Sequence, residues 1–568
     1  MSRFLSFDRQ LFLVSLLVLG ITVTAEEGGA SKVVAPAAPT VRLELDVVDA
    51  ASHRPLACRV HLRNDRGDWF HVDSADGQAI AYRRQMPHLP SSPEVHTTVT
   101  AASFFAELPP GSYQLRVERG KEYHPAHVEF QVSDEPLCQT ITLRRWIDMA
   151  DRGWYSGDTH VHRDIDELPN VMLAEDLNVA FPITSWVRDT ADQPSPFELG
   201  PLNRQNASGT IEVDATHVIV PRNTEYEIFA VNGRPRTLGA VLILNQTSGL
   251  DLSAPPLVPI AEQARSQGAL LDLDKHSWPW SLMIVPTMGI DFFELSNNHV
   301  WQTEFGFHQW TIDAVPPYMR VQRDERGLTE WGWIDFGMQT YYELINCGFR
   351  MRVTAGTASG VHPVQLGFGR VYVRLPNGFS HQDWVNGLNA GQSFVTTGPM
   401  LDLRFNDRDA GEHFQPTNPT DASVRIQGSA ISRRPLKLIE VIVNGNVERA
   451  IHPDNRRSDS GAYVSEIDLE LAKEHSYWAA VRCFEEHPTD RVRFAHTNPV
   501  FVDVPGSHIR PRKEALGYFI SQLENEIADL EGLIDESSID EYRQAIEHYR
   551  ELQHFGTLEN DTTDEATP

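Results

Sequence analysis

Gly157-Asp158-Thr159-His160-Val161-His162 is the stretch of this 568-residue sequence that says most about its fold and chemistry. Side chains two apart in a strand project from one face, so the imidazoles of His160 and His162 can converge on one metal ion. Asp158 shares that face and could orient a ligand from behind it. Because histidine pairs also occur in ordinary packing and surface roles, the surrounding segments must decide between the two.

Four further segments follow this strand along the chain, and their order favours the metal interpretation. They are 223–225 (Asn-Thr-Glu), 269–276 (Ala-Leu-Leu-Asp-Leu-Asp-Lys-His), 291–294 (Asp-Phe-Phe-Glu), and 355–359 with 369–373. With residues 157–162 they resemble the polymerase and histidinol phosphatase (PHP) superfamily of metallohydrolases, and within it the CehA/McbA branch typified by carbaryl hydrolase. The resemblance covers about residues 150–400. It implies an α/β barrel that carries out metal-dependent hydrolysis.

The resemblance also implies a set of metal ligands: His160, His162, Glu225 and His276. Glu225 could bridge two ions. Such a set suits one or two divalent transition-metal ions, zinc, manganese or iron, and these ions activate water near neutral pH. Other roles stay open, because Glu225 could be a solvated strand residue and His276 could stack on a nearby tryptophan.

Several positions depart from the family pattern. Residues 184–186 read Thr-Ser-Trp where the family commonly has Thr-Asp-His, and 357–360 read Thr-Ala-Ser-Gly where it has Ser-Asp-x-His. Gly239-Ala240 similarly replaces a Gly-His pair. Neither serine nor tryptophan is a good ligand for a dication of this kind, so a second metal position is expected to be weakened. His362, His299 and Glu294 are possible additional ligands, each with an ordinary hydrogen-bonding role as the alternative.

Arg370 opens the segment 370–373, which belongs to the family resemblance. A guanidinium there could bind a phosphate or carboxylate group of the substrate. A structural salt bridge is the alternative role for this residue.

The rest of the chain predicts a multidomain α/β plus all-β protein. Arg3 and Arg9 precede a short apolar run and a Val-Thr-Ala site, which is typical of a signal peptide over 1–25. Period-two patterns predict two β-sandwiches, and two stretches at helical spacing predict a hairpin of amphipathic helices. The expected segments are a linker at 26–40, a transthyretin- or carboxypeptidase-regulatory-like sandwich at 41–145, the PHP-like barrel at 146–400, the second sandwich at 401–505, the hairpin at 511–556 and a disordered tail at 557–568.

Composition limits the partners. The chain has 49 basic and 78 acidic side chains, a formal net charge of −29, and so lacks the basic footprint that nucleic acids and anionic membranes require. We expect a small-molecule, glycan or peptide ligand, and no membrane span after the signal is removed. Cys58 and Cys138 could form a disulfide or remain free thiols.

Two functions from different classes follow. The first is an exported, periplasmic or extracellular, hydrolase that uses a metal-activated water on a phosphoester, ester, amide or carbamate bond. The second is a non-catalytic envelope protein that binds a ligand in a degenerate PHP barrel. The histidine pair, Glu225 and His276 favour the hydrolase, and the missing ligands favour the binding protein.

Overall fold

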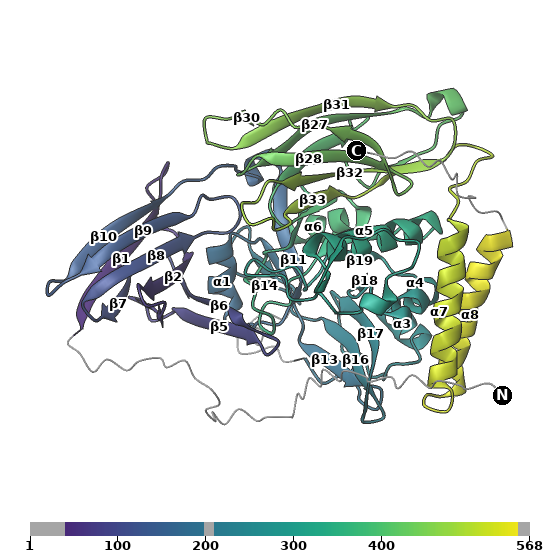
Figure 1. Ribbon diagram of the computed structural model, residues 1–568, viewed down its shortest axis with the longest axis horizontal. Coiled ribbons are helices and arrows are strands. Elements are labelled where there is room, and N and C mark those ends of the chain that lie inside the picture. The colour runs from purple at the N-terminus through teal and green to yellow at the C-terminus, as the bar shows by residue number, and fades with distance from the viewer. Residues whose placement is uncertain (1–39, 198–208, 555–568) are drawn as a thin grey trace.

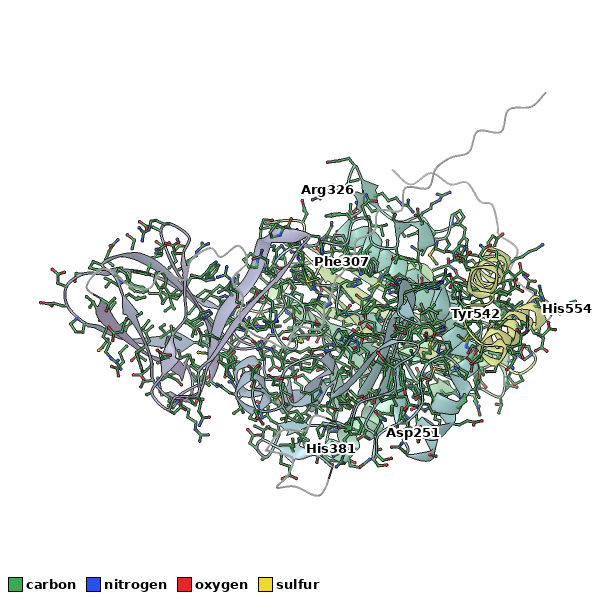
Figure 2. The ribbon with its side chains drawn as sticks, turned by 90° about the horizontal axis from the view of Figure 1, so that it is seen from below. Asp251, Phe307, Arg326, His381, Tyr542 and His554 are labelled. Atoms are coloured by element: carbon green, nitrogen blue, oxygen red, sulfur yellow. The ribbon has the colours of Figure 1, made fainter. Side chains whose placement is uncertain are left out.

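A computed structural model describes residues 40–197 and 209–554 of the chain. The expected signal peptide, nearly all of the linker and the expected tail at 557–568 lie outside these residues. The described chain forms several sheet-rich units, with the N-terminal sheets at one end of the molecule and a pair of C-terminal helices at the other (Figure 1). Figure 2 shows the same end-to-end order from below, with the two C-terminal helices, α7 Lys513–Leu530 and α8 Glu536–His554, seen nearly end-on.

The N-terminal unit consists of two sheets around one hydrophobic core. One sheet has the order β10-β1-β7-β4, and the other β5-β6-β2-β8-β9 with β3 paired to β2. In β1, Leu43, Leu45 and Val47 alternate with more exposed residues and enter the core. The strands are β1 Val41–Asp49, β2 Cys58–Asn64, β3 Trp69–Phe70, β4 Asp73–Ser74, β5 Ile80–Met86, β6 Leu89–Val99, β7 Phe104–Leu108, β8 Gly111–Glu118, β9 Ala126–Val132 and β10 Leu137–Leu143.

The central unit alternates strands with helices and contains the PHP-like segments. Its strands are β11 Trp154–Val161, β12 Val179–Pro182, β13 Ser185–Asp189, β14 Ile211–Glu212, β15 Val218–Ile219, β16 Thr224–Val231, β17 Arg234–Leu244, β18 Leu270–Leu273, β19 Phe292–Ser296, β20 Arg323–Asp324, β21 Gly327–Leu328, β22 Arg352–Ala355, β23 Arg370–Arg374 and β24 Ser393–Thr396. Its helices are α1 Leu168–Glu175, α3 Val258–Ser266, α4 Pro279–Met288, α5 Glu330–Asn346 and α6 His381–Ala390, with short 3-10 turns at Ala150–Arg152 and Ile312–Ala314.

The central strands pair in two main sheets and in the small separate sheet β20-β21. One has the order β13-β16-β17-β18-β19-β22, and β11 and β12 belong to the other. An isolated bridge between Val161 and Ser359 links the end of β11 to the loop after β22. The pairing found among the described residues therefore does not confirm a closed α/β barrel.

The sheet that contains β11 continues into the C-terminal unit. Its order is β14-β15-β12-β11-β23-β24-β33-β32-β28-β29, so β24 pairs directly with β33 across the expected boundary near residue 400. A second sheet, β25-β27-β31-β30, covers it around a shared core. The strands are β25 Met400–Phe405, β26 His413–Phe414, β27 Val424–Ser432, β28 Leu436–Val443, β29 Asn446–Ile451, β30 Arg456–Arg457, β31 Tyr463–Leu471, β32 Tyr477–Glu485, β33 Phe494–Thr497 and β34 Val500–Val502, with a 3-10 turn at Pro419–Asp421.

Two helices end the described chain, α7 Lys513–Leu530 and α8 Glu536–His554. They lie side by side against α4 and α3, on the side of the central unit away from the N-terminal sheets (Figure 1). Apolar residues at helical spacing, among them Leu516, Phe519 and Leu523, are buried in the central core. The burial of this apolar helix face explains why the two helices pack on the central unit.

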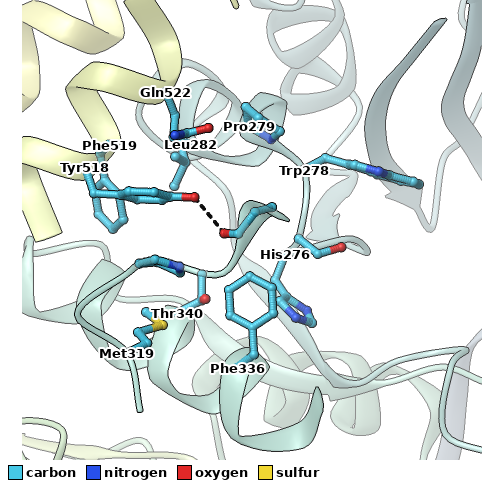
Figure 3. A pocket seen from close by; sticks show the side chains of 13 residues that line it. His276, Trp278, Pro279, Leu282, Met319, Phe336, Thr340, Tyr518, Phe519 and Gln522 are labelled. Carbon is cyan, nitrogen blue, oxygen red and sulfur yellow. Dashed lines mark hydrogen bonds between the residues drawn. The ribbon is translucent and has the colours of Figure 1, made fainter. Parts of the chain in front are cut away.

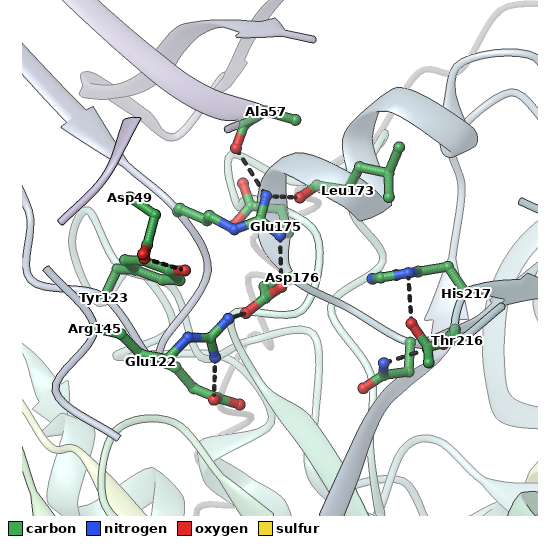
Figure 4. Close-up of polar contacts among 12 residues, drawn as sticks. Asp49, Ala57, Glu122, Tyr123, Arg145, Leu173, Glu175, Asp176, Thr216 and His217 are labelled. Carbon is green, nitrogen blue, oxygen red and sulfur yellow. Dashed lines mark hydrogen bonds and ion pairs between the residues drawn. The ribbon is translucent and has the colours of Figure 1, made fainter. Parts of the chain in front are cut away.

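The joint between the N-terminal sheets and α1 contains partly buried ion pairs (Figure 4). The Arg119 guanidinium lies 2.7 Å from Asp176, which ends α1, and also donates to the carbonyl of Ala57. Arg145 reaches both Asp176, at 2.8 Å, and Glu122, at 2.6 Å. These pairs fix the N-terminal unit beside the strands that carry the histidines.

All four cysteines are free, so Cys58 and Cys138 do not form the possible disulfide. Cys58 is buried in the N-terminal core and Cys138 is exposed. Among the described residues, no helix combines the length and the apolar character that a membrane crossing needs.

Candidate metal centre

His160 and His162 lie at the end of β11 and face the carboxylate of Glu225 from β16. The two Nε2 atoms are 3.1 Å apart, and the Glu225 oxygens lie 3.5 Å from His160 Nε2 and 3.1 Å from His162 Nε2. Ligand atoms about 2.1 Å from a tetrahedral ion lie about 3.4 Å from one another. The three side chains therefore have the spacing of three ligands on one ion.

The other ring nitrogen of His160 faces carboxylates. His160 Nδ1 lies 3.2 Å from Glu294 Oε2 and 3.6 Å from Asp274 Oδ1. A carboxylate in this place holds the proton on Nδ1 and leaves the Nε2 lone pair free, which is the usual arrangement behind a metal-binding histidine. Burial opposes a charge on this ring, but the carboxylates of Glu225, Glu294 and Asp274 raise the pKa of His160 well above its ordinary value.

The polypeptide packs tightly around this ring. At Gly356, after β22, an added Cβ would lie 2.3 Å from the Cβ of His160 and 2.6 Å from Glu294 Oε1. Only glycine fits this close approach of backbone to side chain. Gly356 therefore lets the loop after β22 approach His160 closely. In the same loop, which belongs to the segment 355–359, the Ala358 N–H donates to the His160 carbonyl of β11.

Asp158 is buried behind the histidines, and its expected role in orienting a ligand stays a prediction. Its carboxylate accepts hydrogen bonds from the Thr357 hydroxyl at 2.6 Å and from the backbone N–H groups of Gly367 at 2.9 Å and His160 at 3.2 Å. Burial raises the pKa of Asp158 to about 6, although these hydrogen bonds oppose the rise. Asp158 ties β11 to the loops after β22.

A further group of carboxylates adjoins the histidines. Oxygens of Glu225, Glu227 and Asp274 lie within 4.8 Å of one another, and all three residues are buried. Lys275 accompanies them, hydrogen-bonded to Asp274 and 3.5 Å from Glu227 Oε1. Burial, together with the negative charges of Glu225 and Asp274, raises the pKa of Glu227 to about 8 despite Lys275.

His276 lies apart from these carboxylates. Its ring contacts Trp333 and Phe336, at centroid distances of 4.9 and 5.0 Å, and its Nδ1 lies 3.4 Å from the Asn297 amide. Figure 3 shows His276 beside Phe336 at the wall of a mostly apolar pocket against α7. Burial lowers the pKa of His276 to about 3. The described structure places this ring in an aromatic cluster, and its expected role as a ligand is not supported by any contact to the other ligands.

His299 and His362 also lie outside the His160, His162 and Glu225 set. Their ring centroids are 6.2 Å apart, and the His299 ring stacks on Phe307 at 3.9 Å. Burial lowers the pKa of both, that of His362 to about 3. Each has a buried Nδ1 without a hydrogen-bond partner. The two rings lie against Phe307 and Trp301 and not with the His160, His162 and Glu225 set.

Arg370 is buried and donates to backbone carbonyls. Its guanidinium bonds to the carbonyl oxygens of Gly367 at 2.6 Å, Glu175 at 3.1 Å and Asp176 at 3.2 Å. These contacts give it a structural role in joining β23 to the end of α1. The expected anion-binding role of Arg370 stays a prediction.

Trp186, in the segment where the family resemblance predicts a ligand, lies beside His162. The Trp186 ring is 4.7 Å from the His162 ring, and Trp186 is paired with Glu225 in the register of β13 and β16. Ser185 is buried, and its hydroxyl has no hydrogen-bond partner. An aromatic ring thus borders the centre where the family pattern supplies a ligand.

The buried polar atoms fit a bound cation. Both oxygens of Glu225, Asp274 Oδ1 and Glu294 Oε1 are buried without a hydrogen-bond partner. Buried charges are normally paired or bound to metal. Carboxylates outnumber cationic groups here, because Asp158, Glu225, Glu227, Asp272, Asp274 and Glu294 are all buried around Lys275 and the two histidines. Burial raises the pKa of Asp158, Glu227, Asp272 and Glu294, and a divalent ion at His160, His162 and Glu225 would favour the ionised form of these groups.

A separate histidine cluster in the N-terminal unit fits a metal less well. His61, Glu94 and His96 lie close together, but guanidinium groups of Arg59 and Arg116 lie 3.2 and 3.3 Å from His61 Nε2. Two positive charges beside the ring nitrogen oppose a bound cation.

Asp274, Glu227 and Lys275 were not among the residues expected from sequence. Asp272 and Asp274 alternate at the end of β18, and Glu225 and Glu227 alternate in β16, so each pair shares a face. Two acidic pairs on strands of one sheet would have been a usable signal. The family resemblance predicted His276 as the metal ligand of this segment instead.

Comparisons with known proteins add little to these residues. No protein-family model matches the chain, and no curated protein matches it significantly. Among solved structures, it is similar to a two-domain protein from Bacteroides vulgatus that is described as containing a predicted PHP-like metal-dependent phosphoesterase. The match covers 58% of this chain and 90% of that chain, with 10% sequence identity and a TM-score of 0.26. A likeness this weak carries no argument, so the case for a metal centre depends on the side chains themselves.

Proposed function

We propose that this protein is a PHP-type metal-dependent hydrolase, with one divalent transition-metal ion, zinc, manganese or iron, held by His160, His162 and Glu225. The observation that supports this most strongly is the mutual spacing of the three ligands, 3.1 to 3.5 Å. Two histidines and one glutamate form a known catalytic zinc set that leaves a coordination position open. A bound ion of this kind lowers the pKa of water and polarises the bond to be cleaved.

The chain's own residues prepare this chemistry. Glu294 holds the Nδ1 proton of His160, at 3.2 Å, so that Nε2 faces the ion. Asp158 fixes the strand that carries both histidines. The Trp186 ring against His162 excludes water from one side of the centre.

The charge around the centre bears on the substrate. Lys275 is the cation that faces these carboxylates, and it is already paired with Asp274. In the proposed site, one divalent ion and Lys275 together offset the charges of Glu225, Glu227 and Asp274, so little positive charge is left to bind a dianionic phosphate group. Among phosphoester, ester, amide and carbamate bonds, we therefore favour an uncharged acyl bond, in a small molecule or in a glycan or peptide ligand.

Metal content tests the proposal. Wild-type protein, dialysed against a weak chelator and analysed by plasma mass spectrometry, is expected to retain about one transition-metal ion per chain. The His160→Ala, His162→Ala double variant is expected to retain none. A His127→Ala, His452→Ala variant, which removes two exposed histidines, controls for surface binding. A folded wild type that takes up no metal would overturn the proposal.

Turnover separates the hydrolase from the second candidate. The metal-loaded protein is expected to hydrolyse aryl esters or carbamates, and the double variant is not. Metal binding without hydrolysis of esters, amides, carbamates or phosphoesters would favour a ligand-binding protein, which the Trp186 replacement beside His162 also favours.

We also propose that the protein is exported, because its first 25 residues have the pattern of a signal peptide. The mass of the mature protein isolated from its native host tests this. A mass that corresponds to removal of about 25 residues is expected, and an intact N-terminus in the cytoplasm would contradict export.

A further inference from the structure

The group formed by Glu225, Glu227 and Asp274 has the ligands for a second cation. Oxygens of the three carboxylates lie within 4.8 Å of one another. Both oxygens of Glu225 and Oδ1 of Asp274 are buried and lack hydrogen-bond partners. Glu225 also belongs to the histidine set, and a shared carboxylate is a common bridge in two-ion hydrolases, where the ions lie about 3.5–4 Å apart.

The ammonium group of Lys275 already lies next to these carboxylates. Lys275 is 2% exposed, so its charge cannot be solvated by water. Its Nζ donates to Asp274 Oδ2 and lies 3.5 Å from Glu227 Oε1. A buried ammonium is tolerated only when it is paired, and here its partners are two of the three carboxylates that a second ion would need.

The backbone holds Lys275 in this position. Residue 275 follows directly after Asp274, beyond the end of β18, and its carbonyl accepts a hydrogen bond from the Ser281 hydroxyl in α4. The turn between β18 and α4 is therefore anchored at its middle. Withdrawal of the ammonium would require this turn to rearrange.

We infer that Lys275 acts as a built-in cation that takes the place of a second metal ion and limits the centre to one. The inference rests on the proposed metal centre. A second dication would have to displace the ammonium, because two adjacent positive charges repel each other strongly in a buried site. One metal ion and one ammonium together balance the carboxylates of Glu225, Glu227 and Asp274.

The test counts and locates the bound ions. Crystals of wild type and variants, grown with excess Zn²⁺, are examined by anomalous scattering, and dissolved samples by plasma mass spectrometry. Wild type is expected to show one ion at His160, His162 and Glu225. Lys275→Met and the more polar Lys275→Gln are expected to gain a second ion between Glu225, Glu227 and Asp274, which raises the zinc content from about one to about two per chain.

Two controls make the result specific. Lys121→Met removes a partly buried lysine that donates to the Thr397 carbonyl instead of to these carboxylates, and should keep one ion. The double variant Lys275→Met, Glu227→Gln removes the ammonium together with one ligand and should also return to one.

The outcomes distinguish the inference from the proposed function. Two ions in the wild-type centre, or one ion in a folded Lys275→Gln protein, would overturn the inference and leave the metal centre standing. A wild type without zinc would overturn both. If both lysine variants fail to fold, the wild-type ion count alone still decides whether the centre takes one ion.

Discussion

Glu294 acts on the metal centre through a single hydrogen-bonding position. Its Oε2 lies 3.2 Å from His160 Nδ1, on the side of the ring that faces away from His162. We expect Glu294→Gln to weaken metal binding by about 10- to 100-fold, because the charge that holds the Nδ1 proton and makes Nε2 a better donor is lost. Competition with a chromophoric chelator measures the affinity.

Glu325→Gln is the matched control for this variant, since Glu325 is exposed and belongs to the same unit. It should bind metal as wild type does. Equal affinities for all three proteins would mean that Glu294 does not orient His160.

The candidate ligands show what a sequence can and cannot reveal at the scale of single residues. His160 and His162 share a strand, so their common face follows from the two-residue period alone. Their approach to Glu225, 65 positions along the chain, was expected only from the family resemblance. Which of Asp274 and His276 approaches the centre depends on where β18 ends. The ends of helices and strands are the least certain part of any sequence-based prediction.

Strand β5 controls a loop beside the centre. The Tyr82 hydroxyl donates to the His362 carbonyl at 2.6 Å and accepts from the Gly360 N–H at 3.2 Å. The same loop supplies the Ser359 carbonyl that accepts from the His162 N–H at 2.8 Å. A strand of the N-terminal unit therefore supports the backbone next to a proposed ligand.

Tyr82→Phe should loosen this loop. The change leaves the buried Gly360 N–H without its acceptor, which costs about 1–3 kcal/mol, while the His362 carbonyl keeps its hydrogen bond from the Val364 N–H. Hydrogen exchange followed by mass spectrometry is expected to show faster exchange in peptides that contain Gly360 and His362. Tyr113→Phe, which removes a hydroxyl that donates to the Pro109 carbonyl at 2.8 Å, should leave those peptides unchanged. Unchanged exchange in the Tyr82 variant would show that the loop is held by other contacts.

At the scale of elements, the hydrophobic periods in the sequence predicted where strands lie better than which strands pair with each other. The alternation in 41–47 and 438–443 corresponds to β1 and β28. Nothing in the local pattern of β24 indicates that it pairs with β33, about 100 residues later. Such pairing is set by which apolar faces meet in the folded chain, and a short window of sequence does not contain that information.

The whole molecule is joined by sheet continuity on one side and by buried charge on the other. The long sheet runs from β14 through β11 and β24 to β29, so the central and C-terminal units share backbone hydrogen bonds. The N-terminal sheets instead meet α1 through ion pairs among Arg59, Arg119, Arg145 and their carboxylates. The expected division of the chain into separate domains therefore stays a prediction.

Arg59 tests the contribution of this charged joint. Its guanidinium pairs with Glu175 of α1 and lies 2.6 Å from Glu118 of β8, and all three side chains are buried. Arg59→Met removes the charge and leaves both carboxylates inside the protein, which is expected to cost about 3–5 kcal/mol of unfolding free energy.

Denaturant unfolding, followed by circular dichroism, measures the loss. A second substitution, Glu175→Gln, should recover part of it in the Arg59→Met background, because one unpaired charge is then removed. Arg425→Met, which breaks an exposed pair with Asp468, should leave the unfolding midpoint unchanged, since solvent and salt already weaken that contact. If Arg59→Met also unfolds at the wild-type midpoint, the ion pairs do not stabilise the joint, and the apolar contacts between α1 and the N-terminal strands must hold the two units together.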